Sequence, residues 1–107
     1  MKKLCALAIL CLSFSAHAVV IKGARSCGQW VKSHQSAETT VESVTQEAWL
    51  MGYLSGLAFA HDVDFLRGVE TESMFLWTTN YCKAKPLEDI SAAGDALALE
   101  LGKKKKP

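Results

Sequence analysis

Residues 48–60 read AWLMGYLSGLAFA, a run of thirteen residues without a single charged side chain. Glu47 and Asp62 bracket this run, which is shorter than the roughly 20 apolar residues that a membrane-spanning helix needs. A helix that is apolar on every side is either buried on every side or covers a partner. The run therefore predicts the central helix of a small all-α domain.

Two glycines interrupt the run. Gly52 and Gly56 are four residues apart and share one face of the predicted helix. Each costs about 1 kcal/mol relative to alanine, and the close approach of another helix backbone would offset that cost. We expect Gly52 and Gly56 to be helix-packing positions inside the domain; contact with a second chain is the alternative.

Aromatic side chains are numerous for a chain of this size, with eight of them between residues 19 and 107. Most belong in the core, but Trp and Tyr are also typical anchors of binding surfaces. We expect a protein-binding surface on the central helix, formed by Trp49, Met51, Tyr53, Leu54 and Leu57.

Helical periodicity predicts four helices, at residues 26–35, 41–60, 72–84 and 87–101. Ser26 and Thr71 are the expected N-caps of the first and third helices. Pro86 suits the first turn of the fourth helix, and Gly102 suits its end. Strand signals are confined to residues 19–21. The fold class is therefore all-α, a small four-helix domain.

The N-terminus has the features of a secretory signal peptide. Lys2 and Lys3 precede an apolar segment at 4–15, and Ala16-His17-Ala18 matches an A-x-A cleavage site. We predict cleavage after Ala18, Sec-type export and a periplasmic location. The domain organisation is then a signal peptide at 1–18, a helical domain at 19–102 and a basic disordered tail at 103–107.

Charge is divided unevenly along the chain. The full sequence has a net charge of +1, but residues 19–102 hold 6 Lys and Arg against 11 Asp and Glu, and Lys103–Lys106 follow directly. This balance argues against a strongly basic nucleic-acid binder, and a length of 107 residues argues against a multidomain enzyme. We expect the lysine tail to be solvated; docking on a membrane surface or a partner is the alternative.

Cysteines occur at positions 5, 11, 27 and 82, and only Cys27 and Cys82 remain after the predicted cleavage. An even pair in a small exported domain most simply forms a disulfide, here closing a loop of 55 residues. A metal-binding pair or a catalytic thiol is the alternative, although the sequence contains no CxxC motif.

Catalytic signatures are missing from the sequence: it has no nucleophile elbow, P-loop, dinucleotide fingerprint or zinc-protease motif. His61 lies near Asp62 and Asp64, which are too few oxygen ligands for a calcium loop. We expect His61 to be a solvated helix end, and we expect a protein that is not an enzyme and that binds no cofactor or metal.

The early Cys27 beside an aromatic residue, the segment from Gly68-Val69 through Met74 to Cys82, and the final helix ending in lysines resemble the HdeA/HdeB family of periplasmic acid-stress chaperones. The resemblance implies a small helical protein with one disulfide. It also implies a homodimer that dissociates in acid and exposes apolar surface to unfolding clients. Protonation of the 11 carboxylates would supply the change in charge.

The segment Trp49-x-x-Gly52-Tyr53-x-x-Gly56, with Tyr81 near Pro86, is also similar to the Tai/Rap family of type VI secretion amidase-immunity proteins. This second resemblance implies a periplasmic helical dimer that inhibits a cell-wall amidase, with residues 61–70 as the inserted loop. A structural subunit of an envelope complex is a third expectation. All three place protein binding, rather than catalysis, at the centre of the function.

Overall fold

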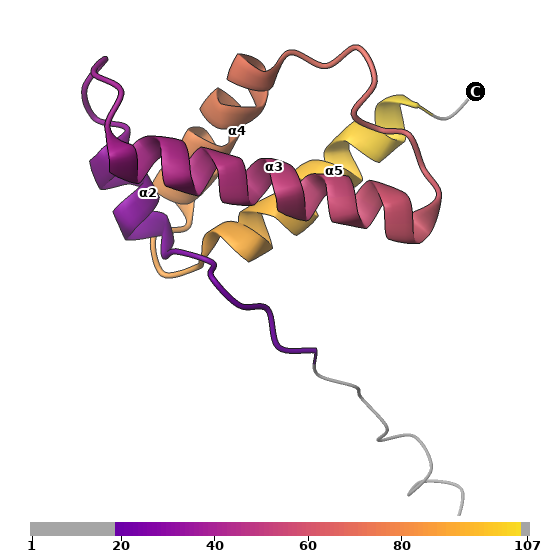
Figure 1. Ribbon diagram of the computed structural model, residues 1–107, viewed down its shortest axis with the longest axis horizontal. Helices are drawn as coiled ribbons and strands as arrows, with labels where there is room; N and C mark the ends of the chain where they lie inside the picture. Colours follow the sequence, from indigo (N-terminus) through magenta and orange to yellow (C-terminus); the bar gives the residue numbers. More distant parts are fainter. Residues whose placement is uncertain (1–18, 106–107) are drawn as a thin grey trace, which may run out of the picture.

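The computed structural model describes residues 19–105, which form four helices: α2 (Cys27–Ser33), α3 (Val41–His61), α4 (Thr71–Ala84) and α5 (Ile90–Lys104). The long helix α3 lies across α5, while the short α2 packs against both α3 and α4 (Figure 1). Between residues 19 and 105 the only β-type pairing is an isolated bridge between Ser26 and Asp89. The all-α fold class is confirmed. The predicted signal peptide lies outside the described residues.

Local hydrogen bonds explain where α2 and α3 begin. Ser26 is the N-cap of α2, as predicted, and its side chain accepts from the backbone N–H of Gln29 at 3.1 Å. Thr40 caps α3 in the same way, accepting from Ser43 N–H at 3.0 Å. In both helices the side chain of the third residue accepts a hydrogen bond from the backbone N–H of the N-cap, which completes a capping box.

The start of α4 differs from the prediction. Glu70, not Thr71, is its N-cap, and its side chain makes no capping bond. Thr71 is instead the first residue of the helix, and Gly68, where φ is +77°, forms the turn that precedes it.

The ends of α5 also differ from the prediction. Its N-cap is Asp89, whose carboxylate accepts from the backbone N–H groups of Ser91 and Ala92. This cap outweighs the preference of Pro86 for a first turn, so Leu87 lies outside the helix and is fully exposed.

The C-terminal part of α5 continues through Gly102 to Lys104, so the helix includes Lys103 and Lys104 of the predicted tail, and Lys105 is its C-cap. Lysine is a good helix former, and its charge is favourable at the C-terminal end of a helix dipole. Of the predicted tail, Lys106 and Pro107 lie outside the described residues.

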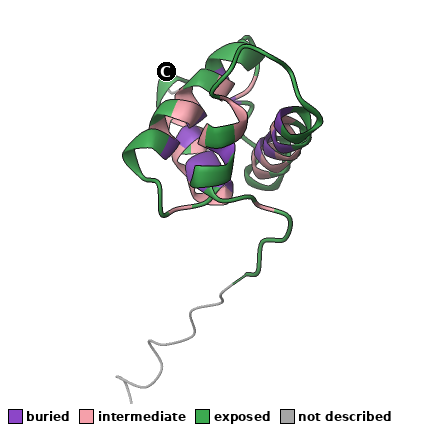
Figure 2. Ribbon diagram, turned by 90° about the vertical axis from the view of Figure 1, so that its left-hand side faces the viewer, coloured by how far each residue is buried: buried purple, intermediate pink, exposed green. Residues whose placement is uncertain are grey.

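A single core lies between the helices. Figure 2 shows the buried residues on the inner sides of the helices and the exposed residues on their outer sides. A disulfide between Cys27 and Cys82 joins α2 to α4, as predicted, with the two Cα atoms 4.8 Å apart. Both cysteines are fully buried. The larger buried members of the core are Trp30, Leu50, Leu54, Phe65, Met74, Ile90, Leu97 and Leu101.

Helix packing through Gly52 and Gly56 is not what the structure shows, and that prediction was wrong. Both glycines are exposed, and a Cβ atom built on either would meet nothing within 4 Å. The close approach of α3 and α5 occurs instead at Gly94, where a Cβ atom would lie 2.8 Å from the ring of Tyr53 and 3.4 Å from Leu50. Gly94 is therefore the glycine that the packing of these two helices requires.

Alanine substitutions at these glycines should change the free energy of unfolding in opposite directions. We expect Gly94→Ala to lower the free energy of unfolding by about 1–3 kcal/mol, because the added methyl group overpacks the α3–α5 contact. Gly52→Ala and Gly56→Ala should each raise it by up to about 1 kcal/mol, because alanine favours the helix and the space is open. Urea unfolding checks both signs. Equal effects at Gly94 and Gly52 would contradict this packing.

Candidate protein-binding surface

The solvent side of α3 carries an uncharged surface. Helical periodicity brings positions 48, 52, 55, 56 and 59 onto one face, and all five are exposed. We call this the outer α3 surface; its residues are Ala48, Gly52, Ser55, Gly56 and Phe59. The side chain of Phe59 is the large member, and the residue is 90% exposed.

The residues predicted to bind a partner lie on the opposite side or on the edges of α3. Leu54 is fully buried and belongs to the core, so in this conformation it cannot contact another protein. Trp49, Met51 and Leu57 are half-buried and pack against the core, and Tyr53 is half-buried as well.

Sequence reasoning missed Phe59 as a surface residue. The signal was available, because Phe59 is seven residues after Gly52 and three after Gly56, on the face that the glycines mark.

A shallow groove lies at the N-terminal end of the outer α3 surface. It encloses about 410 Å³ between residues 20–22 and the α3 residues Ala48, Trp49, Gly52 and Tyr53. Trp49 Nε1 donates to the carbonyl of Lys22 at 3.0 Å, and the rings of Trp49 and Tyr53 stack at 5.0 Å. The groove thus brings together three of the residues singled out from the sequence: Trp49, Gly52 and Tyr53.

Gly23 fixes the path of the segment that forms the other wall of this groove. Its φ is +83°, and a Cβ atom there would lie 2.9 Å from Trp49 Nε1. Only glycine fits this turn without strain. Residues 20–22 are consequently held beside α3, although Val20 itself is 71% exposed.

Carboxylates anchor several contacts that hold the elements together. The Tyr53 hydroxyl donates to Asp95 at 2.5 Å, which links α3 to α5, and the Tyr81 hydroxyl donates to Glu88. Burial, and then the hydrogen bond to Asp95, raise the pKa of Tyr53 to about 12. The hydrogen bond to Glu88, and then burial, raise the pKa of Tyr81 to about 12 as well.

These two tyrosines predict a loss of stability in alkali. Because the folded-state pKa of each is about 12 and the unfolded value is near 10, their contribution is complete below pH 10 and is lost as pH rises toward 12. Absorbance at 295 nm should show tyrosinate forming near pH 12 in the native protein and near pH 10 in urea. Between pH 10 and pH 12 the free energy of unfolding of Y53F/Y81F should fall less than that of the wild-type protein. A midpoint of tyrosinate formation near pH 10 in the native protein would contradict the raised pKa values.

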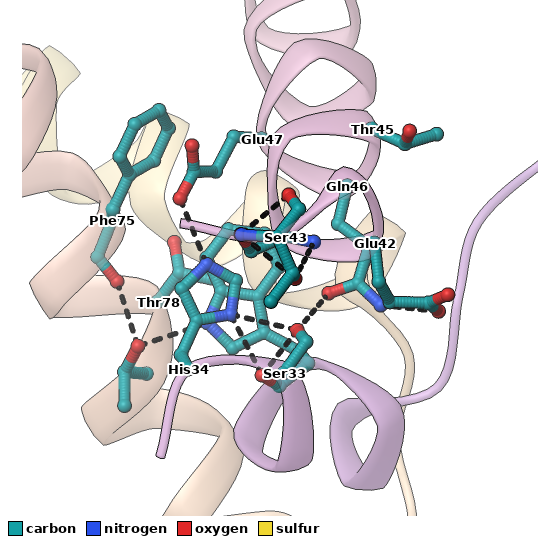
Figure 3. A network of polar contacts seen from close by, with 12 residues as sticks. Ser33, His34, Glu42, Ser43, Thr45, Gln46, Glu47, Phe75 and Thr78 are labelled. Atoms are coloured by element: carbon teal, nitrogen blue, oxygen red, sulfur yellow. Dashed lines mark hydrogen bonds and ion pairs between the residues drawn. The ribbon is translucent and has the colours of Figure 1, made fainter. Parts of the chain in front are cut away.

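A polar network joins α2 to the first half of α3 (Figure 3). The ring of His34 stacks on Trp30 with centroids 4.1 Å apart. Its Nδ1 lies 2.7 Å from the carbonyl oxygen of Trp30, and its Nε2 lies 3.0 Å from a carboxylate oxygen of Glu47. Both ring nitrogens therefore lie beside oxygen atoms, and His34 links the two helices.

The same network satisfies the buried Gln46. Its Oε1 accepts from the Ser33 hydroxyl at 2.7 Å, and its Nε2 donates to Glu42. Across residues 19–105 every fully buried side-chain nitrogen and oxygen atom has a hydrogen-bond partner. The network thus leaves no buried polar atom of these side chains without a hydrogen bond.

Other candidate sites are weaker. A second hollow of about 540 Å³ near the start of α5 includes Glu88, Asp89 and Asp95 in its lining. Within the described part of the chain, no group of three or more His, Cys, Asp or Glu side chains is placed to hold a metal ion. Helices long and apolar enough to cross a bilayer are likewise absent from residues 19–105.

Comparison of the chain with protein-family models, with curated proteins and with solved structures finds no match. The resemblances to the two families named above therefore rest on their short motifs alone.

Proposed function

We propose that this chain is an exported, non-enzymatic protein that acts by binding other proteins, and that a partner first contacts the outer α3 surface. The observation that carries the proposal is an exposed, charge-free helix face on which Phe59 is 90% exposed. A large exposed aromatic side chain on a surface without charges offers an anchor for a partner. Gly52 and Gly56, with open space beside them, allow the backbone of a partner to approach closely.

Acid would loosen the contacts that hold α3 in place. Tyr53–Asp95 and His34–Glu47 each depend on a carboxylate acceptor, and a protonated carboxyl group accepts more weakly. The Asp89 cap of α5 responds in the same direction. The Ser91 hydroxyl, and then the backbone N–H of Ala92, lower the pKa of Asp89. Its stabilisation is complete above the unfolded value near 3.9 and is lost as pH falls through the lower folded value.

Charge repulsion would add to this loosening. After the predicted cleavage the chain holds 10 Lys and Arg and 11 Asp and Glu, so protonation of the carboxylates leaves a strongly positive molecule. Separation of α3 from α5 would uncover Leu50 and Leu54, beside the half-buried Trp49, Met51 and Leu57. The carboxylate contacts of α3 and the charge balance support an acid-stress chaperone of the HdeA/HdeB type, in which the inner side of α3 becomes a client-binding surface.

An acid-aggregation assay tests this function. An acid-labile enzyme is brought to pH 2–3 with and without the protein, and light scattering is recorded. We expect the protein to suppress scattering, and Phe59→Ser to reduce that protection severalfold. The matched control is Leu87→Ser, which removes a fully exposed apolar side chain outside the helices and should leave protection unchanged.

Two outcomes would count against the proposal, each in a different way. Equal client aggregation with and without the protein would reject the chaperone function. Protection that is unaffected by Phe59→Ser would retain the function but reject the outer α3 surface as its entry point.

A second candidate function is inhibition of a cell-wall amidase, as in the Tai/Rap immunity proteins. The observation that favours it is the loop at residues 62–70. Phe65 is 4% exposed and anchors this loop in the core, while Asp64 and Arg67 remain exposed at its tip and pair at 2.5 Å. A loop anchored in this way is suited to entering an enzyme cleft. A toxin gene beside this one, and inhibition of its product by the protein, would support this function.

Affinity capture from periplasmic extract separates these functions from that of a structural subunit. Many partners captured at pH 3 but not at pH 7 would favour a chaperone. One stoichiometric partner at pH 7 would favour an inhibitor or a subunit of an envelope complex. Size-exclusion chromatography of the purified protein at both pH values tests the homodimer that both family resemblances imply.

A further inference from the structure

The C-terminal end of α5 is the positively charged end of an otherwise acidic chain. Lys103 and Lys104 form the last residues of the helix, Lys105 is its C-cap, and all three are exposed. In the sequence Lys106 follows directly. By contrast, residues 19–102 hold 6 Lys and Arg against 11 Asp and Glu.

Arg67 belongs to the same end of the molecule. Lys105 Nζ donates to the carbonyl oxygen of Arg67 at 2.7 Å, so the loop at residues 62–70 lies against the end of α5 (Figure 1). We call Arg67, Lys103, Lys104 and Lys105 the basic end. Its ion-pair partners are Asp64, at 2.5 Å from Arg67, and Glu100, at 4.0 Å from Lys103. The four cations exceed these two carboxylates, so the basic end keeps a net positive charge.

The geometry of three consecutive lysines limits what they can bind together. Neighbouring residues on a helix project about 100° apart, so these side chains fan out around the axis of α5. A partner beside the helix can meet at most two of them at once, whereas a flat surface facing the end of the helix can meet all three once Lys105 Nζ exchanges its hydrogen bond to the Arg67 carbonyl for the surface. Lysine carries a point charge on a flexible stem and lacks the fork with which arginine grips a single phosphate. A broad surface of diffuse negative charge fits this arrangement.

We infer that the basic end docks the protein on an anionic phospholipid surface. The remaining charges favour one orientation, because Glu88 and Asp89 lie at the start of α5, the end farthest from the lysines. An anionic surface therefore attracts one end of α5 and repels the other. Each basic residue near such a surface strengthens binding about fivefold, and salt screens the effect.

Vesicle co-sedimentation tests the inference with the chain from Val19 onward, which contains all four helices. We expect binding to vesicles of phosphatidylglycerol and phosphatidylcholine in equal parts, no binding to phosphatidylcholine alone, and loss of binding as salt rises from 10 to 150 mM. The variant K103Q/K104Q/K105Q should weaken binding by roughly 100-fold if the three contributions of about fivefold multiply.

The matched control is K32Q/K83Q/K85Q, which changes the net charge equally at exposed lysines elsewhere. It should weaken binding by less than threefold. Equal losses in the two triple variants would overturn the inference, since net charge alone would then explain binding. So would binding to phosphatidylcholine alone, or equally tight binding to soluble polyglutamate, which would make the basic end a general polyanion site. Circular dichroism confirms that both variants are folded.

Discussion

Replacement of both disulfide cysteines, C27A/C82A, should lower the free energy of unfolding by roughly 4 kcal/mol. The bond closes a loop whose ends are 55 residues apart, and without it the unfolded chain gains the conformational freedom that the loop removes. A domain of this size has a total stability of only about 5–15 kcal/mol. The disulfide therefore contributes a large share of it, and urea unfolding followed by circular dichroism measures the loss.

Reduction provides the control for this prediction. Unfolding of the wild-type protein in the presence of a reductant should show nearly the same loss, whereas C27A/C82A should be insensitive to the reductant. A loss below about 1 kcal/mol in both experiments would show that the α2–α4 contact holds without the bond. A loss in the variant alone would instead assign the effect to the packing of the buried sulfur atoms.

Removal of the Trp30 side chain should have an effect of similar size. Trp30→Ala is expected to cost about 3–5 kcal/mol, the range for truncating a large buried aromatic residue. Trp30 is fully buried, its Nε1 donates to the hydroxyl of Thr79 at 2.9 Å, and its ring stacks on His34. It thereby connects the seven-residue α2 directly to α4 and, through His34, which lies 3.0 Å from Glu47, to α3. The loss is measured by urea unfolding.

Two further variants keep this prediction testable if Trp30→Ala does not fold. Trp30→Phe retains most of the apolar volume but loses the bond to Thr79, and should cost about 1–2 kcal/mol. Trp77→Ala removes a half-buried indole that stacks on Tyr81 at 5.5 Å, and it should cost less than Trp30→Ala. A cost at Trp77 equal to that at Trp30 would contradict the central position of Trp30.

The fold was predictable from the sequence where local signals were strong. Ser26 is a good N-cap, the first half of the segment at residues 41–60 alternates apolar and polar residues with helical spacing, and the two cysteines beyond the predicted signal peptide have one simple pairing. Helix boundaries failed where two local preferences competed. Pro86 favoured an early start for α5, but the carboxylate of Asp89 caps two backbone N–H groups and sets the start at Ile90.

The binding surface was less predictable, because α3 is apolar on nearly every side. When no polar face marks the solvent, the spacing of side chains cannot tell the inside from the outside. The spacing accordingly predicts a surface position for Leu54, which is buried, and an interior position for Gly52, which is exposed. The side of α3 that faces inward is set by Gly94 on α5, whose contact with Tyr53 depends on tertiary geometry.

The position of α2 in the chain has a consequence for the order of folding. This helix is made early in synthesis, yet the partners that hold it against α4 come late: Thr79, Cys82, and the backbone of Glu88, whose carbonyl accepts from Cys27 N–H at 2.8 Å. Seven residues are too few for an isolated helix to persist in water. Cys27 therefore remains a free thiol until some 55 further residues have been synthesised. During that time an oxidant or another thiol can react with it. Closure of the native bond is thus a late event, coupled to the arrival of α4.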